Sequence, residues 1–342
     1  HSLGLLNECS EMFGAAVAAY PTQTATTSVQ NDEEKWIFLL HQTHALVIMG
    51  FYQQAQSLLE TLPQTDHLPP SLQANFHFVQ GHLRLATGTL QDTLDAFTKA
   101  QSLYKACRNL RGQSDATAHA ARAFYRMGRY ESAIELLEEG LEQDRATLYR
   151  RGLAQKLSLL GINKLEVAAP QAALEYIQQA YELALELNNT HDQAWFLNDM
   201  AVVKRRSKRM EDALEHFQQA NQLFRQLGIA SGVATSLANI SNILWLSGRA
   251  EEALTCQKEV LFIFRERGEK AKIGNLLGNM GILYKDQGQY QQARAVLDEA
   301  LEIEKSLENN REVARMYGII AEVLGKQEKW EEALEHIETG MS

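Results

Sequence analysis

Small and bulky side chains recur along this chain with a period of 40 residues. A first column of small residues stands once in every period, most often as alanine. A second small column lies twelve residues before it, a third lies seven residues after it, and a bulky residue such as Phe217 or Leu297 follows the first column by four. Because four residues span about one helical turn, this spacing predicts a helix whose small sites admit a neighbouring helix while large side chains fill the remaining space. The first column comprises Ala55, Thr93, Ala133, Ala173, Ala213, Ala253, Ala293 and Ala333.

Turn residues divide each period into two helices, which we name the A helix and the B helix. A glycine lies five residues before the first small column in five of the units, and Pro170 stands near the place where it is missing in another. Between units, Asn188, Gly228 and Gly268 lie 40 residues apart, where a left-handed residue ends a helix. One such unit cannot bury its hydrophobic face alone, so the pattern predicts an all-α stack of about eight helical hairpins with a continuous core. The five glycines are Gly50, Gly88, Gly128, Gly248 and Gly288.

The repeat accounts for residues 36–342, and residues 1–35 do not fit its register. Leu5, Cys9 and Phe13 have helical spacing, so we expect a capping helix or a remnant B helix there, followed by a polar linker around Pro21 to Asp32. The chain starts with His1 and ends just after the third small site of the last unit, so we expect the natural chain to be longer. The expected units are 36–73, 74–113, 114–153, 154–193, 194–233, 234–273, 274–313 and 314–342.

Composition and charge narrow the kinds of partner. The net charge of −10 repels phosphate backbones and anionic membrane surfaces, so we expect neither nucleic acid nor membrane as a partner. No stretch reaches the ~18 uncharged apolar residues that a membrane span needs. The three cysteines lie far apart, which is typical of reduced thiols in an intracellular protein, and a cytoplasmic location is expected.

Catalytic and metal sites find little support in the sequence. His41 and His44 lie three residues apart on one predicted helix, and His77 and His82 lie in the next unit, but no acidic or thiol partner recurs at ligand spacing. We interpret these side chains as packed or solvated histidines and expect no metal site. The sequence also contains no glycine-rich phosphate loop and no nucleophile motif, so we expect neither an enzyme nor a cofactor.

One segment carries a family resemblance most clearly. The run LGNMGILYKDQGQYQQARAVLDEALEI, in which Gly281, Tyr284, Gly288, Ala293 and Ala300 occupy signature places, resembles a tetratricopeptide repeat. The unit of 40 residues is similar to the long-unit branch of kinesin light chains, Pins-like polarity scaffolds and bacterial regulators. This resemblance implies a right-handed α-α superhelix, and it implies binding of peptides, proteins or small ligands. The signature residues are packing residues, so they indicate the fold more strongly than the function.

The resemblance implies a concave groove lined by A-helix residues, and the middle of this groove is rich in amides and basic groups. Asparagine amides can clamp the backbone of an extended peptide, as they do in long-unit relatives, and arginines would then select acidic side chains. Alternatively, these asparagines simply face water. The run Lys204 to Arg209 is either a docking patch for an acidic partner or a solvated turn. The candidate groove residues are Asn198, Asn239, Asn242, Asn275, Asn279, Arg122, Arg126 and Arg205.

Three functional hypotheses follow. The first is a scaffold or sensor module within a larger cytoplasmic protein, which captures a protein or peptide segment that is either acidic or of any charge. The second is a regulatory domain in which a small ligand controls an attached effector, such as an ATPase or a transcription regulator. The third is self-assembly through exposed Trp36, Trp245 or Trp330.

Overall fold

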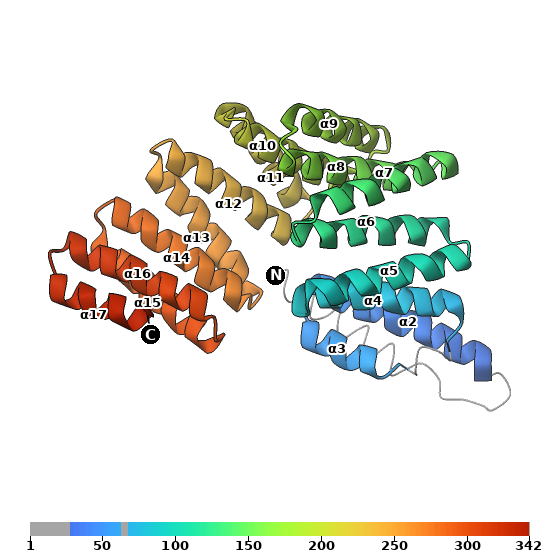
Figure 1. Ribbon diagram of the computed structural model, residues 1–342, viewed down its shortest axis with the longest axis horizontal. Helices are drawn as coiled ribbons and strands as arrows, with labels where there is room; N and C mark the ends of the chain where they lie inside the picture. Colours follow the sequence, from blue (N-terminus) through green and yellow to red (C-terminus); the bar gives the residue numbers. More distant parts are fainter. Residues whose placement is uncertain (1–27, 63–67, 342) are drawn as a thin grey trace. The chain divides into compact units, whose positions relative to one another are not determined.

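A computed structural model of the protein describes residues 28–62 and 68–341, and all regular structure in them is helical. The predicted all-α class is confirmed: A and B helices alternate along the chain, and within each unit described below an A helix packs against the B helix that follows it (Figure 1). The A helices are α2 (Ser28–Met49), α4 (Pro70–Thr87), α6 (Leu110–Arg126), α8 (Arg150–Glu166), α10 (Thr190–Arg206), α12 (Ala230–Leu246), α14 (Lys270–Asp286) and α16 (Asn310–Lys326). The B helices are α3 (Tyr52–Glu60), α5 (Leu90–Ala106), α7 (Tyr130–Thr147), α9 (Pro170–Glu186), α11 (Met210–Gln226), α13 (Ala250–Glu266), α15 (Tyr290–Ser306) and α17 (Trp330–Met341).

The chain divides into two compact units, with the boundary inside α10. Unit 1 ends at Val203 and unit 2 begins at Lys204. No described helix combines the length and the apolar character that a membrane crossing requires.

The small columns pack as the sequence pattern predicts. A Cβ atom added at Gly81 would lie 2.7 Å from the ring of Phe97, and one added at Gly281 would lie 2.6 Å from Leu297. Each glycine is on an A helix and each bulky residue is on the B helix of the same hairpin. The glycines therefore let the two helices of a hairpin approach closely, and the B-helix side chains fill the space that results.

A residue with positive φ follows every helix from α5 to α16. These residues recur every 20 positions, from Arg108 to Glu328. Gly128, Gly228 and other glycines supply this conformation in some turns, as expected, but Leu148 and Ala168 adopt it in others. At Gly88, by contrast, φ is −111°, so this turn closes without a left-handed residue.

The first hairpin begins earlier than the sequence pattern suggests. We expected a polar linker up to Asp32 and a first unit from residue 36, whereas α2 already starts at Ser28. The segment from Ser28 to Asp32 contains no proline or glycine, so nothing in it interrupts a helix that the following residues continue. The expected capping helix falls on residues 1–27, which lie outside the described part of the chain.

Candidate binding surfaces on the A helices

The eight predicted site residues divide between the two units. Arg122, Arg126 and Asn198 belong to unit 1, whereas Arg205 and the four remaining asparagines belong to unit 2. Each unit is therefore considered by itself.

Arg122 is a basic residue on α6 of unit 1. Its side chain reaches solvent, yet protein atoms surround it closely enough that desolvation lowers the pKa of its guanidinium. The carboxylates of Asp199 and Asp192 on α10 oppose this effect. The described residues give Arg122 no hydrogen bond and no ion pair, so its donors are available to a ligand.

Asp199 faces the same region of unit 1. Burial raises the pKa of its carboxyl to about 6, although a hydrogen bond from Ser158 and the charge of Arg122 favour the ionised form. The Ser158 hydroxyl on α8 donates to Oδ2 of Asp199 over 2.7 Å. Its neighbour Asn198 is only 5% exposed, and its Oδ1 is buried without a hydrogen-bond partner. The side chain of Asn198 is thus directed mainly into the protein.

Other side chains tie neighbouring A helices of unit 1 together. Arg126 is exposed, and its Nη1 donates to the backbone oxygen of Leu85 in the last turn of α4 over 3.0 Å. The Tyr125 hydroxyl donates to Oε1 of Glu166 on α8 over 3.0 Å. One nitrogen of Arg126 therefore caps α4, while the rest of the guanidinium stays accessible.

Three histidines form a ladder across α2, α4 and α6. The ring centroids of His44 and His82 lie 4.8 Å apart, and those of His82 and His119 lie 4.2 Å apart. The ring of His119 also stacks on Phe97 at 5.1 Å. Burial lowers the pKa of His44, lowers that of His82 to about 3, and lowers that of His119 well below its usual value. These histidines are packed and neutral, and no group of three or more His, Cys, Asp or Glu within the described ranges is placed to hold a metal ion.

In unit 2, exposed asparagines line the A helices. Asn242 on α12 and Asn275 and Asn279 on α14 are exposed, and no described residue forms a hydrogen bond with their amides. Asn239 differs, because it is half-buried and its Nδ2 donates to the backbone oxygen of Thr235 over 3.1 Å. Three of the four asparagines therefore present free amides to solvent.

A cavity of about 310 Å³ lies beside Asn239. Charged groups near its rim are already paired, since Arg267 and Lys272 both contact Glu269. The other lining residues are Ser231, Ala234, Thr235, Ala238, Ile263 and Phe264. The cavity is large enough for a small organic ligand.

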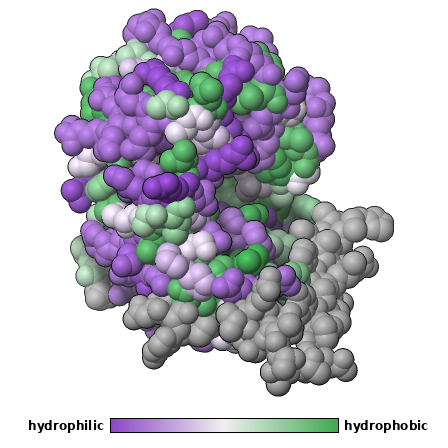
Figure 2. Space-filling model, turned by 90° about the vertical axis from the view of Figure 1, so that its right-hand side faces the viewer, coloured by the Kyte–Doolittle hydropathy of each residue, from purple (hydrophilic) through white to green (hydrophobic). Residues whose placement is uncertain are grey.

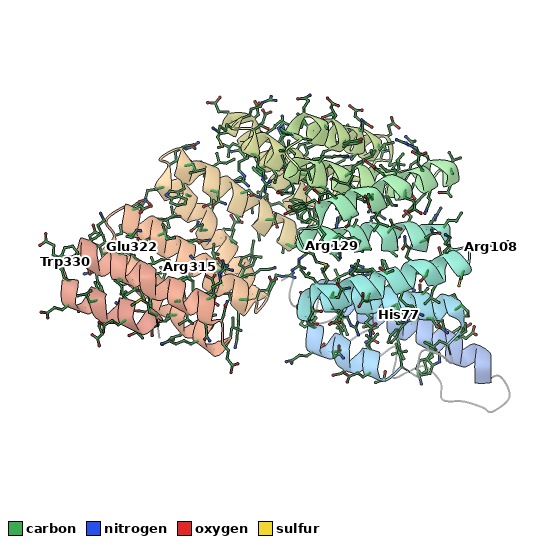
Figure 3. The ribbon with its side chains drawn as sticks, in the orientation of Figure 1. His77, Arg108, Arg129, Arg315, Glu322 and Trp330 are labelled. Atoms are coloured by element: carbon green, nitrogen blue, oxygen red, sulfur yellow. The ribbon has the colours of Figure 1, made fainter. Side chains whose placement is uncertain are left out.

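Arg315 on α16 is a candidate that the sequence analysis missed. Its Nε donates to Oε2 of Glu312 over 2.6 Å, while its Nη2 is buried without a partner (Figure 3). A Cβ at Gly278 would lie 2.8 Å from that nitrogen, so the glycine on α14 makes room for the guanidinium. The signal in the sequence was weak, because an arginine at the start of an A helix also suits a solvated surface.

Two residues of the basic run contact side chains of unit 2, and one of these contacts is an ion pair. Nζ of Lys204 lies 3.0 Å from Nε2 of His216, and Arg209 forms an ion pair of 2.6 Å with Asp212. Arg205 is half-buried, and its Nε has no hydrogen-bond partner. Arg205 therefore has one N–H donor, at Nε, that no described residue accepts.

The three tryptophans named for self-assembly have different surroundings. Trp36 packs against the buried core of α2, α3 and α4, whereas Trp245 is 38% exposed. Trp330, labelled in Figure 3, is 63% exposed. It borders a hollow of about 1060 Å³ between α16 and α17, together with Gly318 and Leu334. The face drawn in Figure 2 is mostly hydrophilic over its described residues, with apolar side chains in small separate groups.

Comparison with known proteins decides the family. A family model described as tetratricopeptide repeat matches residues 192–266 and 272–342, and a second model of the same description matches residues 116–149. The chain belongs to the tetratricopeptide repeat family. A comparison of this tetratricopeptide repeat protein with curated protein sequences finds no significant match.

Several solved structures share the tetratricopeptide repeat fold of this chain. The apo form of the quorum sensor NprR from B. thuringiensis has 18% identity and a TM-score of 0.61, with 90% of this chain and 87% of that chain covered. Aspartyl phosphate phosphatase F from Bacillus subtilis has 14% identity and a TM-score of 0.56, with 94% and 96% covered. A Rap protein complexed with competence and sporulation factor has 13% identity and a TM-score of 0.57, with 88% and 99% covered. At such identities the likeness concerns the fold.

Proposed function

We propose that this tetratricopeptide repeat protein is a cytoplasmic recognition module that captures an extended peptide or protein segment on its A helices, as the sensing or scaffold part of a regulatory system. The observation that carries the proposal is the set of free amides at Asn242, Asn275 and Asn279. An amide offers both a donor and an acceptor, so it can bind the backbone of an extended segment whatever the sequence of that segment.

The position of these asparagines supports a role in binding. Asparagine in the middle of a helix costs up to about 0.7 kcal/mol relative to alanine, and an exposed amide without a partner contributes nothing to the fold in return. Asn275 and Asn279 are four residues apart on α14, so they share one face of the helix. Arg315 on the neighbouring α16 adds a guanidinium nitrogen without a partner.

Two structural neighbours support a sensor role. NprR is described as a quorum sensor, and a Rap protein is described in complex with competence and sporulation factor. A comparable role for this chain would assign it binding rather than catalysis. It also makes flanking effector domains a reasonable expectation.

The proposal is tested by affinity capture from a native lysate with two variants of the full chain. We expect Asn275→Ala with Asn279→Ala to lose the captured protein without a change in helix content, because alanine keeps the helix and removes the amides. The control is Gln291→Ala with Gln292→Ala, which removes two exposed amides from the B helix of the same hairpin. Equal capture by both variants would contradict the proposal.

A small-ligand sensor is the second candidate function, and the cavity beside Asn239 favours it. Native mass spectrometry of the chain purified from its own cell extract would detect a bound metabolite. A bound metabolite together with no captured protein would favour this second function over peptide capture. Replacement of Ala234 by Phe should then expel that metabolite, because the larger side chain fills the cavity.

A further inference from the structure

Ionisable residues form a column along the first three A helices. His44 on α2, His82 on α4 and Arg122 on α6 each follow the second small column by one residue. In the next two units this place holds Ile162 and Val202. Within unit 1 the column is therefore confined to α2, α4 and α6, where the histidine ladder lies.

Two ring nitrogens in the ladder lack hydrogen-bond partners. Nε2 of His82 and Nδ1 of His119 are both buried, and no described residue binds either. A buried polar atom without a partner costs about 1–3 kcal/mol, so native proteins rarely leave two of them side by side. Arg122 lies one helical turn beyond His119, and within residues 28–62 and 68–341 no group forms a hydrogen bond or an ion pair with it. A guanidinium and two imidazole nitrogens without partners thus gather at one place, and each imidazole nitrogen can donate to an anion when it carries a hydrogen.

Titratable and charged groups on α2, α4, α6 and α10 influence the protonation of these rings. Burial lowers the pKa of His82 and His119 most, and the positive charge of Arg122, together with that of a neighbouring histidine whenever it is protonated, lowers it further. His41 acts on His44 in the same way. On the opposite side, Asp192 and Asp199 on α10 act on Arg122. The ladder thus stays neutral partly because a guanidinium without a paired anion lies beside it.

We propose that Arg122, His82 and His119 bind a carboxylate side chain of the captured segment, and that the histidines take up a proton when they do so. This inference rests on the proposed peptide-binding function and adds the chemistry of one contact. The incoming carboxylate would neutralise Arg122 and provide a counter-ion for an imidazolium, and both effects make protonation of the rings more favourable. By thermodynamic reciprocity, a proton on the rings must then strengthen the binding of the carboxylate.

The sign of the pH dependence follows from this coupling. Because the pKa of the rings is higher in the complex than in the free protein, affinity rises as the pH falls through the value in the complex. The rise stops near pH ~4, where the ligand carboxylate itself becomes protonated. Asp199 acts in the same direction: its pKa is about 6, and once protonated it no longer competes for Arg122.

The experiment measures proton uptake directly. The full chain is titrated with the capped peptide acetyl-Glu-Glu-Glu-amide by calorimetry at pH 6.5, in two buffers that differ in ionisation enthalpy. We expect an uptake of up to one proton per peptide and an affinity that increases about threefold to tenfold from pH 7.5 to pH 6.0. The neutral peptide acetyl-Gln-Gln-Gln-amide should bind at least tenfold more weakly and without proton uptake.

Variants assign the uptake to the ladder. His82→Gln with His119→Gln should remove most of the proton uptake, and Arg122→Gln should weaken binding about tenfold or more. His336→Gln is the matched control, since it removes an imidazole from α17 in unit 2 and should change neither value. Circular dichroism at each pH verifies that the chain stays folded. The wild-type measurement in two buffers needs no variant, so a variant that misfolds leaves the test intact.

The outcomes separate this inference from the proposed function. Binding of the glutamate peptide without proton uptake, or with equal uptake in the double histidine variant, would overturn the proton coupling. A failure of the glutamate peptide to bind at any pH would overturn the carboxylate site. Neither result affects the capture experiment with Asn275 and Asn279, because those residues belong to unit 2.

Discussion

In the turns that follow α5 to α16, a positive φ recurs at every 20th residue, although the type of residue at that place varies. Five of the twelve positive-φ positions that follow α5 to α16 hold glycine, and the others hold residues as different as Leu148, Asn188 and Lys208. A residue with a Cβ atom pays roughly 1–2 kcal/mol for this conformation. Glycine is thus favoured in these turns but not required, since helix packing on both sides can hold a less suitable residue in place.

Gly128 allows a direct measurement of this cost. Its φ is +73°, and apart from Gly128 and its two chain neighbours no described residue has an atom within 4 Å of the place where a Cβ would stand, so only the backbone conformation opposes a side chain. We expect Gly128→Ala to lower the free energy of unfolding by about 1 kcal/mol, measured by urea denaturation. Gly128→Asn should cost less, because asparagine tolerates the left-handed region better.

Gly318 is the matched control. It also has open space around its Cβ position, but it lies inside α16 with an ordinary helical backbone. Gly318→Ala should therefore stabilise the chain by about 0.5–1 kcal/mol, because glycine loses more conformational entropy than alanine in a helix. If both alanine variants changed stability in the same direction, the turn argument would be wrong.

At the scale of elements, one buried ion pair joins three helices of unit 1. Nζ of Lys156 on α8 lies 2.5 Å from Oδ2 of Asp144 on α7 and 2.5 Å from Oγ of Ser114 on α6. Lys156 is 0% and Asp144 2% exposed. A Cβ at Gly152 would lie 2.7 Å from Oδ2 of Asp144, so this glycine makes room for the pair. The contact specifies how two hairpins meet, because it joins α8 of one hairpin to α6 and α7 of the preceding one.

Removal of one member of this pair should be far more harmful than removal of both. Lys156→Met leaves a buried carboxylate without a counter-ion, so we expect the free energy of unfolding to fall by about 3–5 kcal/mol. Lys156→Met combined with Asp144→Leu should recover most of this loss, because no charge is then buried.

An exposed pair on the same helix serves as the comparison. Arg145 and Glu142 on α7 form an ion pair of 2.6 Å in which the side chains are 55% and 73% exposed. Arg145→Met should therefore change stability by less than about 1 kcal/mol. Equal losses in Lys156→Met and Arg145→Met, both measured by urea denaturation, would show that burial does not govern the strength of the Lys156 contact.

The repeat pattern predicted contacts that recur and missed contacts that occur once. Gly281 and Leu297 meet because their columns exist in every unit, so the period of 40 carries that information. Lys156, by contrast, stands in a register place that holds Phe196 and Met316 in other units. Its partners on α6 and α7 could not be identified from spacing, since they depend on side-chain positions that no period encodes.

The same reason explains the mixed result at the candidate sites. Register predicts which residues stand on an A helix, and Asn275 and Asn279 are indeed exposed there. Asn198 stands one place away in the register, at the place of the buried Gly278, and it turns into the protein. The register also does not predict that three histidines from different units meet. Whether the exposed asparagines bind a partner stays a prediction.

At the scale of the whole molecule, burial is distributed unevenly along the array. In unit 2, α14 has neighbours on both sides and contributes nine buried residues, from Ile273 to Tyr284. The last described helix, α17, has Ala333 as its single buried residue. Because each hairpin of such an array is stabilised mainly by its neighbours, stability should decrease toward α17.

Hydrogen exchange tests this gradient in the chain of 342 residues. We expect the amides of α17 to exchange first and those of α14 to need an opening free energy that is several kcal/mol higher, because few apolar contacts hold α17 in place. The exposed Trp330 and the hollow beside it could bind a second copy of the chain, so the exchange is measured at two protein concentrations. If protection of α17 rose with concentration, a second copy of the chain would be covering Trp330, and self-association would gain support.

Equal protection of α14 and α17 at every concentration would instead mean that unit 2 opens as one cooperative body, and the nearest-neighbour account of its stability would fail.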